Sequence, residues 1–194
     1  NAEVDALYLL ASADVRVPTP FGCFEGVLLM ELVTNDDGDV APRLNDVIMS
    51  PEQAIEDHQL MMIYVMRMLC AGIVHGDLSE FNVLVDDYGP VIIDLPQAVN
   101  AAANNNAKAM HKRDVDNITD YYGQFAPELL KSKYAQEMWA LFEGGELTQE
   151  TVLTGLFKEN TQAADVDTVL EEIKAAFAEE QARLERIREA NEVE

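Results

Sequence analysis

Residues 73–95 read IVHGDLSEFNVLVDDYGPVIIDL and contain the pattern that decides the fold. Two short runs rich in β-branched residues flank the turn sequence DDYG at 86–89, which is typical of a hairpin. Asp77 and Asn82 precede the first run, on a loop that follows a long predicted helix, and Asp94 ends the second run. Because a hairpin brings its two ends together, the sequence predicts that Asp77, Asn82 and Asp94 share one cleft.

These three side chains suit the chemistry of phosphoryl transfer. Amide and carboxylate oxygens are ligands for Mg²⁺, which keeps waters and substrate phosphates as its other ligands. An Asp that does not bind the metal is able to accept the proton of a hydroxyl nucleophile. Each of the three residues alone is equally consistent with an ordinary turn or strand end, but the joint pattern favours metal ligands and a base, as phosphoryl transfer requires.

The remaining sequence predicts helices and one further hairpin. Apolar spacing predicts helices near residues 2–13, 51–71, 111–124, 125–143, 148–158 and 165–190. Ser50 followed by Pro51 is a typical helix start, Gly72 is a natural stop, and Glu25-Gly26 splits two apolar runs as a hairpin turn does. Since the strands occur as hairpins and not in strand–helix–strand units, the sequence predicts an α+β fold with a mainly helical larger part.

Composition narrows the classes of partner and setting. The chain has 36 acidic and 13 basic residues and a formal charge of −23, which disfavours direct nucleic-acid binding and favours a basic protein partner. It lacks an apolar run of about 18 residues, so no membrane span is predicted. Only two cysteines, Cys23 and Cys70, are present, which excludes a disulfide scaffold or a four-cysteine zinc site and indicates a reducing, cytoplasmic setting.

The strings IVHGDLSEFNVLV at 73–85 and VIIDLPQAV at 91–99 resemble the catalytic and metal-binding loops of the RIO-type atypical serine/threonine protein kinases. Ordinary protein kinases are less similar, since they carry Arg in place of Gly76 and Phe-Gly in place of Leu95-Pro96. The strings LLMELV, DDGDVAPRL and KRDVDNITDYY also resemble segments of the RIO family, so the similarity covers roughly residues 1–125. The loop resembles a bacterial variant.

The resemblance implies a protein-kinase-like fold that uses ATP and Mg²⁺. Asp77 is then the catalytic Asp, Asn82 and Asp94 hold Mg²⁺, and Asp94 is also a candidate nucleophile that takes up the phosphoryl group. Asp114 is expected to hydrogen-bond the backbone of the catalytic loop, and Glu3 to pair with a phosphate-binding Lys. The nucleotide-contacting positions implied by the resemblance are Met30, Glu31, Val33, Ser79, Leu84 and Ile93, where Glu31 and Val33 offer backbone groups to adenine and Ser79 replaces a Lys of other kinases.

The resemblance also implies a domain organisation. Residues 1–33 are expected to be the end of the small lobe, 34–125 the large lobe, and 126–194 a C-terminal helical extension. The Gly-rich phosphate loop and the strand with its Lys are expected to precede residue 1, as for a fragment that does not begin with Met.

Three functions remain open from the sequence. The first is a RIO-type serine/threonine kinase, or an ATPase that uses the same site. The second is a nucleotide-binding switch or assembly factor without turnover, and the third is a small-molecule kinase of the aminoglycoside or choline type, which shares the His-Gly-Asp and Asn of the loop. Among the histidines, His75 is expected to brace the loop near Asp94, and His58 and His111 are expected on solvated helix faces.

Overall fold

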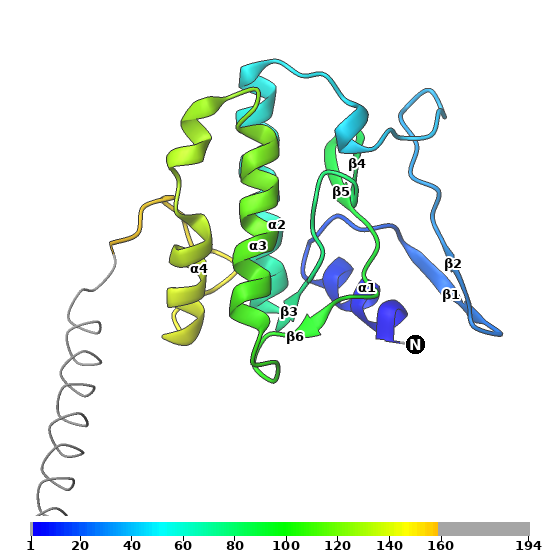
Figure 1. The fold of residues 1–194 in the computed structure, drawn as a ribbon. Coiled ribbons are helices and arrows are strands. Elements are labelled where there is room, and N and C mark those ends of the chain that lie inside the picture. The colour runs from blue at the N-terminus through cyan, green and yellow to red at the C-terminus, as the bar shows by residue number, and fades with distance from the viewer. Residues whose placement is uncertain (1, 159–194) are drawn as a thin grey trace, which may run out of the picture. The chain divides into compact units, whose positions relative to one another are not determined.

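The computed structural model describes residues 2–158, and residues 2–157 form one compact unit (Figure 1). Its helices and strands follow in the order α1 (Ala2–Ser12), β1 (Pro20–Phe24), β2 (Val27–Met30), η1 (Leu44–Asp46), α2 (Pro51–Cys70), β3 (Ile73–Val74), β4 (Val83–Asp86), β5 (Gly89–Ile92), β6 (Val99–Asn100), α3 (Ala107–Tyr122), η2 (Pro127–Lys131) and α4 (Tyr134–Glu143). The strands pair as three separate antiparallel ribbons, β1–β2, β3–β6 and β4–β5. This confirms the predicted α+β class.

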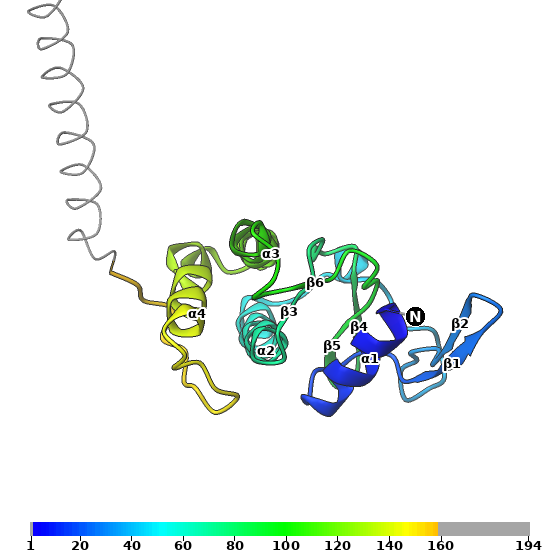
Figure 2. The same cartoon turned by 90° about the horizontal axis from the view of Figure 1, so that it is seen from below.

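Helices α2, α3 and α4 lie side by side and α1 lies near the β4–β5 ribbon, as Figures 1 and 2 both show. The helix α2 is long and deeply buried because its methionines and leucines point into the main core. Its first turn begins as the sequence predicts, since Ser50 Oγ accepts a hydrogen bond from the Gln53 N–H at 3.2 Å. Its C-cap is Ala71, and Gly72 follows with a φ of +78°.

Both predicted hairpins are present. In the β1–β2 ribbon, Glu25 and Gly26 both have positive φ, 50° and 85°, which is the backbone of a tight two-residue turn. In the β4–β5 ribbon, Val83 pairs with Ile92 at one end and Asp86 with Gly89 at the other. Arg16 clamps this second turn, because its guanidinium donates to both Asp86 carboxylate oxygens at 2.9 and 2.5 Å. The loop before Val83 and the chain after Ile92 therefore meet at the end remote from the turn.

The helical predictions after residue 124 are only partly correct. The segment 125–143 divides into the 3₁₀ turn η2 and the helix α4, since the backbone of Ser132 between them is extended. The helix predicted at 148–158 is wrong, because a buried carboxylate holds this segment in an irregular path. Glu137 on α4 accepts hydrogen bonds from the N–H groups of Thr154 (2.8 Å) and Gly155 (2.7 Å), so these donors are not available to a helix.

Two further regions bear on the predicted organisation. The helix predicted at 165–190 lies outside the described residues. Apolar residues of η2 and α4 belong to the same core as α2 and α3, and the domain boundaries predicted after residues 33 and 125 stay predictions. Among residues 2–158, no helix combines the length and apolar character needed to cross a bilayer.

The prediction that His58 and His111 are solvated is wrong. Both rings are buried, His58 against Tyr122 and Tyr134, and His111 against Trp139. Burial lowers the pKa of each imidazole from 6.5 to about 4, because the charged form loses its hydration. The helical spacing did not reveal this, since both residues lie on helices whose inward faces carry polar as well as apolar residues.

We predict that the two histidines lower the stability of the fold in mild acid. A group whose folded pKa is depressed contributes fully above its unfolded pKa of 6.5 and loses this contribution as pH falls towards 4. Each should lower the free energy of unfolding by about 2 kcal/mol between pH 7 and pH 5. Asp57 and Asp114 act in the opposite direction, since burial raises their pKa values.

The measurement is therefore the free energy of unfolding in urea at pH 7 and at pH 5, compared between the parent and a variant. His58→Gln retains a partner for Thr119 Oγ1, which lies 2.9 Å from His58 Nε2, but does not titrate. Its stability should fall less between the two pH values than that of the parent. An equal fall in both proteins would contradict the prediction.

Candidate active site

The loop 75–82 and the chain after β5 are joined through the backbone of Ile93. The Ile93 N–H donates to the Asn82 carbonyl at 3.0 Å, and the Ile93 carbonyl lies 3.0 Å from His75 Nε2. This confirms the expectation that His75 braces the loop beside Asp94. Asp94 follows directly, with a φ of +66° in the left-handed region, two residues beyond the end of the strand that the sequence placed it on.

Asp77 and Asn82 are in direct contact within the loop. The Asn82 side-chain amide donates to the Asp77 carbonyl at 2.7 Å and lies 3.5 Å from Asp77 Oδ2, at the edge of hydrogen-bonding range. Asp77 and Asp94 are exposed and Asn82 is half-buried. The three residues thus lie at the same end of the β4–β5 ribbon, Asp94 through the backbone of Ile93, and they remain accessible to a ligand, although their chemical roles stay predictions.

A carboxylate on α3 fixes the shape of this loop. Asp114 is buried, and its Oδ2 accepts the Gly76 N–H at 2.7 Å while its Oδ1 accepts the Leu78 N–H at 3.1 Å. Burial raises its pKa, and the two backbone donors oppose that rise because they stabilise the ionised form. The predicted hydrogen bonding of Asp114 to the loop is confirmed, and with both oxygens bonded to the loop this side chain acts as a positioning residue.

Two neighbours of Asp114 were missed by sequence reasoning. Arg113 donates to the Gly76 carbonyl, and Asn117 Nδ2 donates to the Leu78 carbonyl at 3.0 Å. Residues 113, 114 and 117 therefore bind both N–H and C=O groups of Gly76 and Leu78. Their i, i+4 spacing placed Arg113 and Asn117 on one helix face, but only the contact with the loop distinguishes that face from a solvated one.

Gly76 is required by the close approach of another segment. Its φ is +85°, and a Cβ at this position would lie 2.6 Å from the Gln97 carbonyl oxygen and 2.7 Å from Met110 Cε. Neither the backbone conformation nor the space accommodates a side chain. The segment after Asp94 is therefore packed directly against the loop that carries Asp77.

The predicted nucleotide-contacting residues fall into two groups. Val33 is buried in a small apolar cluster that also contains Leu84, so these two are brought together. Met30, by contrast, is 43% exposed at the end of β2, and Glu31 is exposed beside it. Ser79 and Ile93 are half-buried near the loop end of the β4–β5 ribbon.

The carboxylate and the backbone N–H of Glu31 are already hydrogen-bonded to Thr19. Its carboxylate accepts the Thr19 N–H at 2.9 Å and the Thr19 hydroxyl at 2.8 Å, and these bonds lower the pKa of Glu31. The Glu31 N–H donates to the Thr19 carbonyl at 2.9 Å. Within the contacts that residues 2–158 make, the carbonyl is therefore the only backbone group of Glu31 that stays open to a ligand.

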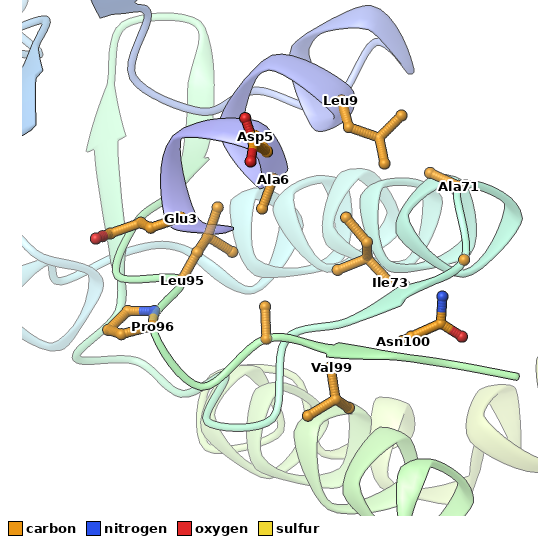
Figure 3. Close-up of a pocket in the computed structure, with 12 residues that line it drawn as sticks. Glu3, Asp5, Ala6, Leu9, Ala71, Ile73, Leu95, Pro96, Val99 and Asn100 are labelled. Carbon is orange, nitrogen blue, oxygen red and sulfur yellow. The ribbon is translucent and has the colours of Figure 1, made fainter. Parts of the chain in front are cut away.

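Two cavities lie close to this region without including its central residues. One, of about 500 Å³, lies between α1, β3 and residues 95–100. Figure 3 shows Ala6, Ile73 and Leu95 around its apolar part, with the Glu3 carboxylate pointing away from it. The other, of about 630 Å³, lies at the turn of the β4–β5 ribbon. Asp77, Asn82 and Asp94 line neither of the two.

The oxygen donors at the loop fit a metal ion that takes its remaining ligands from the substrate. In the part of the chain that the structure describes, no group of three or more His, Cys, Asp or Glu residues is arranged to hold a metal ion. Asn82 and Asp94 supply one amide and one carboxylate, since the Asn82 N–H₂ is turned towards Asp77. A pair of hard oxygen ligands completed by phosphates is how Mg²⁺ commonly binds, whereas Ca²⁺ or Zn²⁺ would need a fuller protein shell.

Comparison with known proteins gives the family. The RIO domain model matches residues 1–135. The RIO-type serine/threonine-protein kinase Rio1 of Haloferax volcanii is 41% identical over 111 residues, which cover 57% of this chain and 37% of that protein. The serine/threonine-protein kinase RIO1 of Homo sapiens is 34% identical over 62% of this chain and 21% of its own length. Rio1 of Thermoplasma acidophilum is 33% identical over 62% of this chain and 61% of its own length.

The chain spans less than two thirds of each of these relatives. They are archaeal or human proteins, so the bacterial character of the loop stays a prediction. The matched range contains the loop 75–82, Asp94 and the anchoring helix α3 together. The chain therefore belongs to the RIO domain family.

Proposed function

We propose that the full-length protein is an ATP- and Mg²⁺-dependent serine/threonine protein kinase of RIO type. The observation that carries the proposal is the accessible arrangement of Asp77, Asn82 and Asp94 around Ile93, on a loop that Asp114 holds in place. The names of the relatives support a protein acceptor over a small alcohol, since all three are serine/threonine-protein kinases.

In this proposal each side chain has a distinct task. Asp77 orients the acceptor hydroxyl and takes its proton, while Asn82 Oδ1 and the Asp94 carboxylate hold Mg²⁺, which neutralises charge on the phosphates of ATP. Val33 and Leu84 supply apolar contact to adenine, and the carbonyl of Glu31 accepts a hydrogen bond from it. Met30, Ile93 and Ser79 complete the nucleotide contacts.

A variant of the mechanism uses Asp94 as the nucleophile. A carboxylate oxygen of Asp94 then bonds to the γ-phosphorus of ATP as the bond to the β,γ-bridging oxygen breaks, which releases ADP. The aspartyl-phosphate passes its phosphoryl group to a hydroxyl acceptor, or to water in an ATPase cycle. The exposed carboxylate of Asp94 and its left-handed backbone support this variant, since such strained positions are concentrated at functional sites.

The partner and the setting are also proposed. A net charge of −23 supports a basic protein substrate and disfavours direct contact with nucleic acid. The chain has only two cysteines, Cys23 and Cys70, and this low count supports a reducing, cytoplasmic setting.

We predict that Asp77→Asn lowers the rate of phosphate transfer in the full-length protein by on the order of 10²–10⁴-fold, because the proton acceptor is lost. Asn82→Ala should raise the Mg²⁺ concentration required for half-maximal rate, and Asp94→Asn should abolish both transfer and any acid-stable or hydroxylamine-sensitive phosphoenzyme. The measurement is transfer of labelled γ-phosphate to protein and to water.

Asp120→Asn is the matched control, since it removes one exposed carboxylate of α3 away from the loop. Unchanged turnover in Asp77→Asn or Asp94→Asn contradicts the kinase proposal. Tight ATP binding by the parent without turnover or phosphoenzyme would instead identify a nucleotide-binding switch.

A second prediction concerns Asp114 as a positioning residue. Asp114→Ala leaves the N–H groups of Gly76 and Leu78 without their acceptor, which should cost about 1–3 kcal/mol in the free energy of unfolding. Asp114→Asn retains one acceptor oxygen and should lose less. In both variants kcat should fall more than KM for ATP rises, because Met30, Glu31, Val33 and Leu84 lie outside the loop that Asp114 anchors.

The readouts are urea unfolding and steady-state kinetics of the full-length protein, again with Asp120→Asn as the control. Equal kcat in the parent and Asp114→Ala would show that the anchor has no part in catalysis.

A further inference from the structure

A second cavity lies at the turn end of the β4–β5 ribbon. This hairpin-turn cavity, of about 630 Å³, is enclosed by the residues before α2, the first half of α2 and the turn 86–89. Because Val83 and Ile92 pair at the loop end and Asp86 and Gly89 at the turn end, the cavity is separated from Asn82 by the length of the ribbon, on the order of 10 Å. A ligand here leaves the loop that carries Asp77 free.

The cavity is lined by four carboxylates, those of Glu56, Asp57, Asp86 and Asp87, and no Lys, Arg or His is among its described lining residues. Arg16 neutralises Asp86 through two hydrogen bonds. The other three have no cationic partner among residues 2–158. A positive charge from outside would therefore meet uncompensated negative charge.

Asp57 is the least expected of these carboxylates. It is only 2% exposed, and its single hydrogen bond is from Gln53 Nε2 to Oδ1 at 2.9 Å. Oδ2 accepts no hydrogen bond from the described residues although Asp57 lines the cavity. Burial and the neighbouring Glu56 raise the pKa of Asp57. Oδ2 is not among the fully enclosed atoms that lack a partner, so it is open to the cavity and a donor on a ligand can bond to it in place of water.

The rim of the cavity is apolar. Ile48 is 94% exposed and Tyr88 is 69% exposed, and Leu60 also lines the cavity. The Tyr88 hydroxyl donates to Asp36 Oδ1 at 2.9 Å, which fixes the ring in place. A fixed aromatic ring and an exposed aliphatic side chain beside carboxylates are complementary to a segment with both cationic and aliphatic side chains.

We propose that the hairpin-turn cavity docks a basic segment of a partner protein, with an Arg or Lys reaching Asp57 and Glu56 and aliphatic residues packing on Ile48 and Tyr88. This inference deepens the proposed function. It rests on the proposed kinase function where the docked segment belongs to the kinase substrate. Arginine is favoured because its planar fork binds carboxylates through paired hydrogen bonds. The same carboxylates repel phosphate, so a nucleic-acid ligand is disfavoured.

The probe is a labelled twelve-residue peptide with two arginines followed by two leucines, and its binding is measured by fluorescence anisotropy without nucleotide. A matched peptide carries glutamines in place of the arginines. We expect the arginine peptide to bind the full-length protein about tenfold or more tightly than the glutamine peptide, with an affinity that falls as salt is raised. Equal binding of the two peptides, or no binding of either, would overturn the proposal.

Variants locate the site. Glu56→Gln combined with Asp87→Asn alters exposed side chains only, and Asp57→Asn removes the buried charge without changing the shape of the side chain. Both should weaken binding of the arginine peptide about tenfold or more, whereas the control Asp120→Asn should not. Far-UV circular dichroism and urea unfolding establish that each variant is folded. Unchanged affinity in the folded Glu56→Gln/Asp87→Asn variant places the peptide elsewhere and overturns the proposal.

The two proposals fail separately. Asp77→Asn should bind the arginine peptide with the parent affinity, because that side chain lies at the opposite end of the ribbon. If the protein binds the arginine peptide but transfers no phosphate, the kinase proposal is contradicted and the docking proposal stands. If it transfers phosphate but does not bind the peptide, the docking proposal is contradicted and the kinase proposal stands.

Discussion

The bond between the buried Asp114 carboxylate and two backbone N–H groups of the loop is the constraint on which the candidate site depends. It links Gly76 and Leu78, on either side of Asp77, to a helix that the core already holds in place. Leu78 is buried in the core, but the neighbouring Asp77 is exposed and has no burial of its own to order it. The anchor provides that order from behind, so Asp77 faces outward on a fixed backbone.

The β4–β5 ribbon gives the site its second part. One end holds Asp94 next to Asn82 through the backbone of Ile93, and the other end forms the wall of the acidic cavity. Arg16 fixes the turn and His75 the opposite end, so a short ribbon with little stability alone becomes a rigid connection. In the proposed kinase, partner docking and phosphoryl transfer would thus share one element without sharing a surface.

Prediction succeeded where the information is local. The start of α2 at Ser50, the turn at Glu25-Gly26 and the hairpin after Asn82 each follow from neighbouring residues and were found. Prediction failed where a residue outside the segment determines the backbone conformation. The carboxylate of Glu137 takes the N–H groups that a helix at 148–158 would have used, and no pattern within that segment indicates this.

The sequence by itself predicted the order of the helices and hairpins as far as α3 and put forward Asp77, Asn82 and Asp94 as a set, because spacing and turn chemistry are properties of adjacent residues. The tertiary structure alone decided that His58 and His111 are buried, that Arg113 and Asn117 grip the loop, and that Asp57 opens into a cavity. Each of these depends on which helix face meets which segment, and that is fixed by packing between residues far apart in the chain.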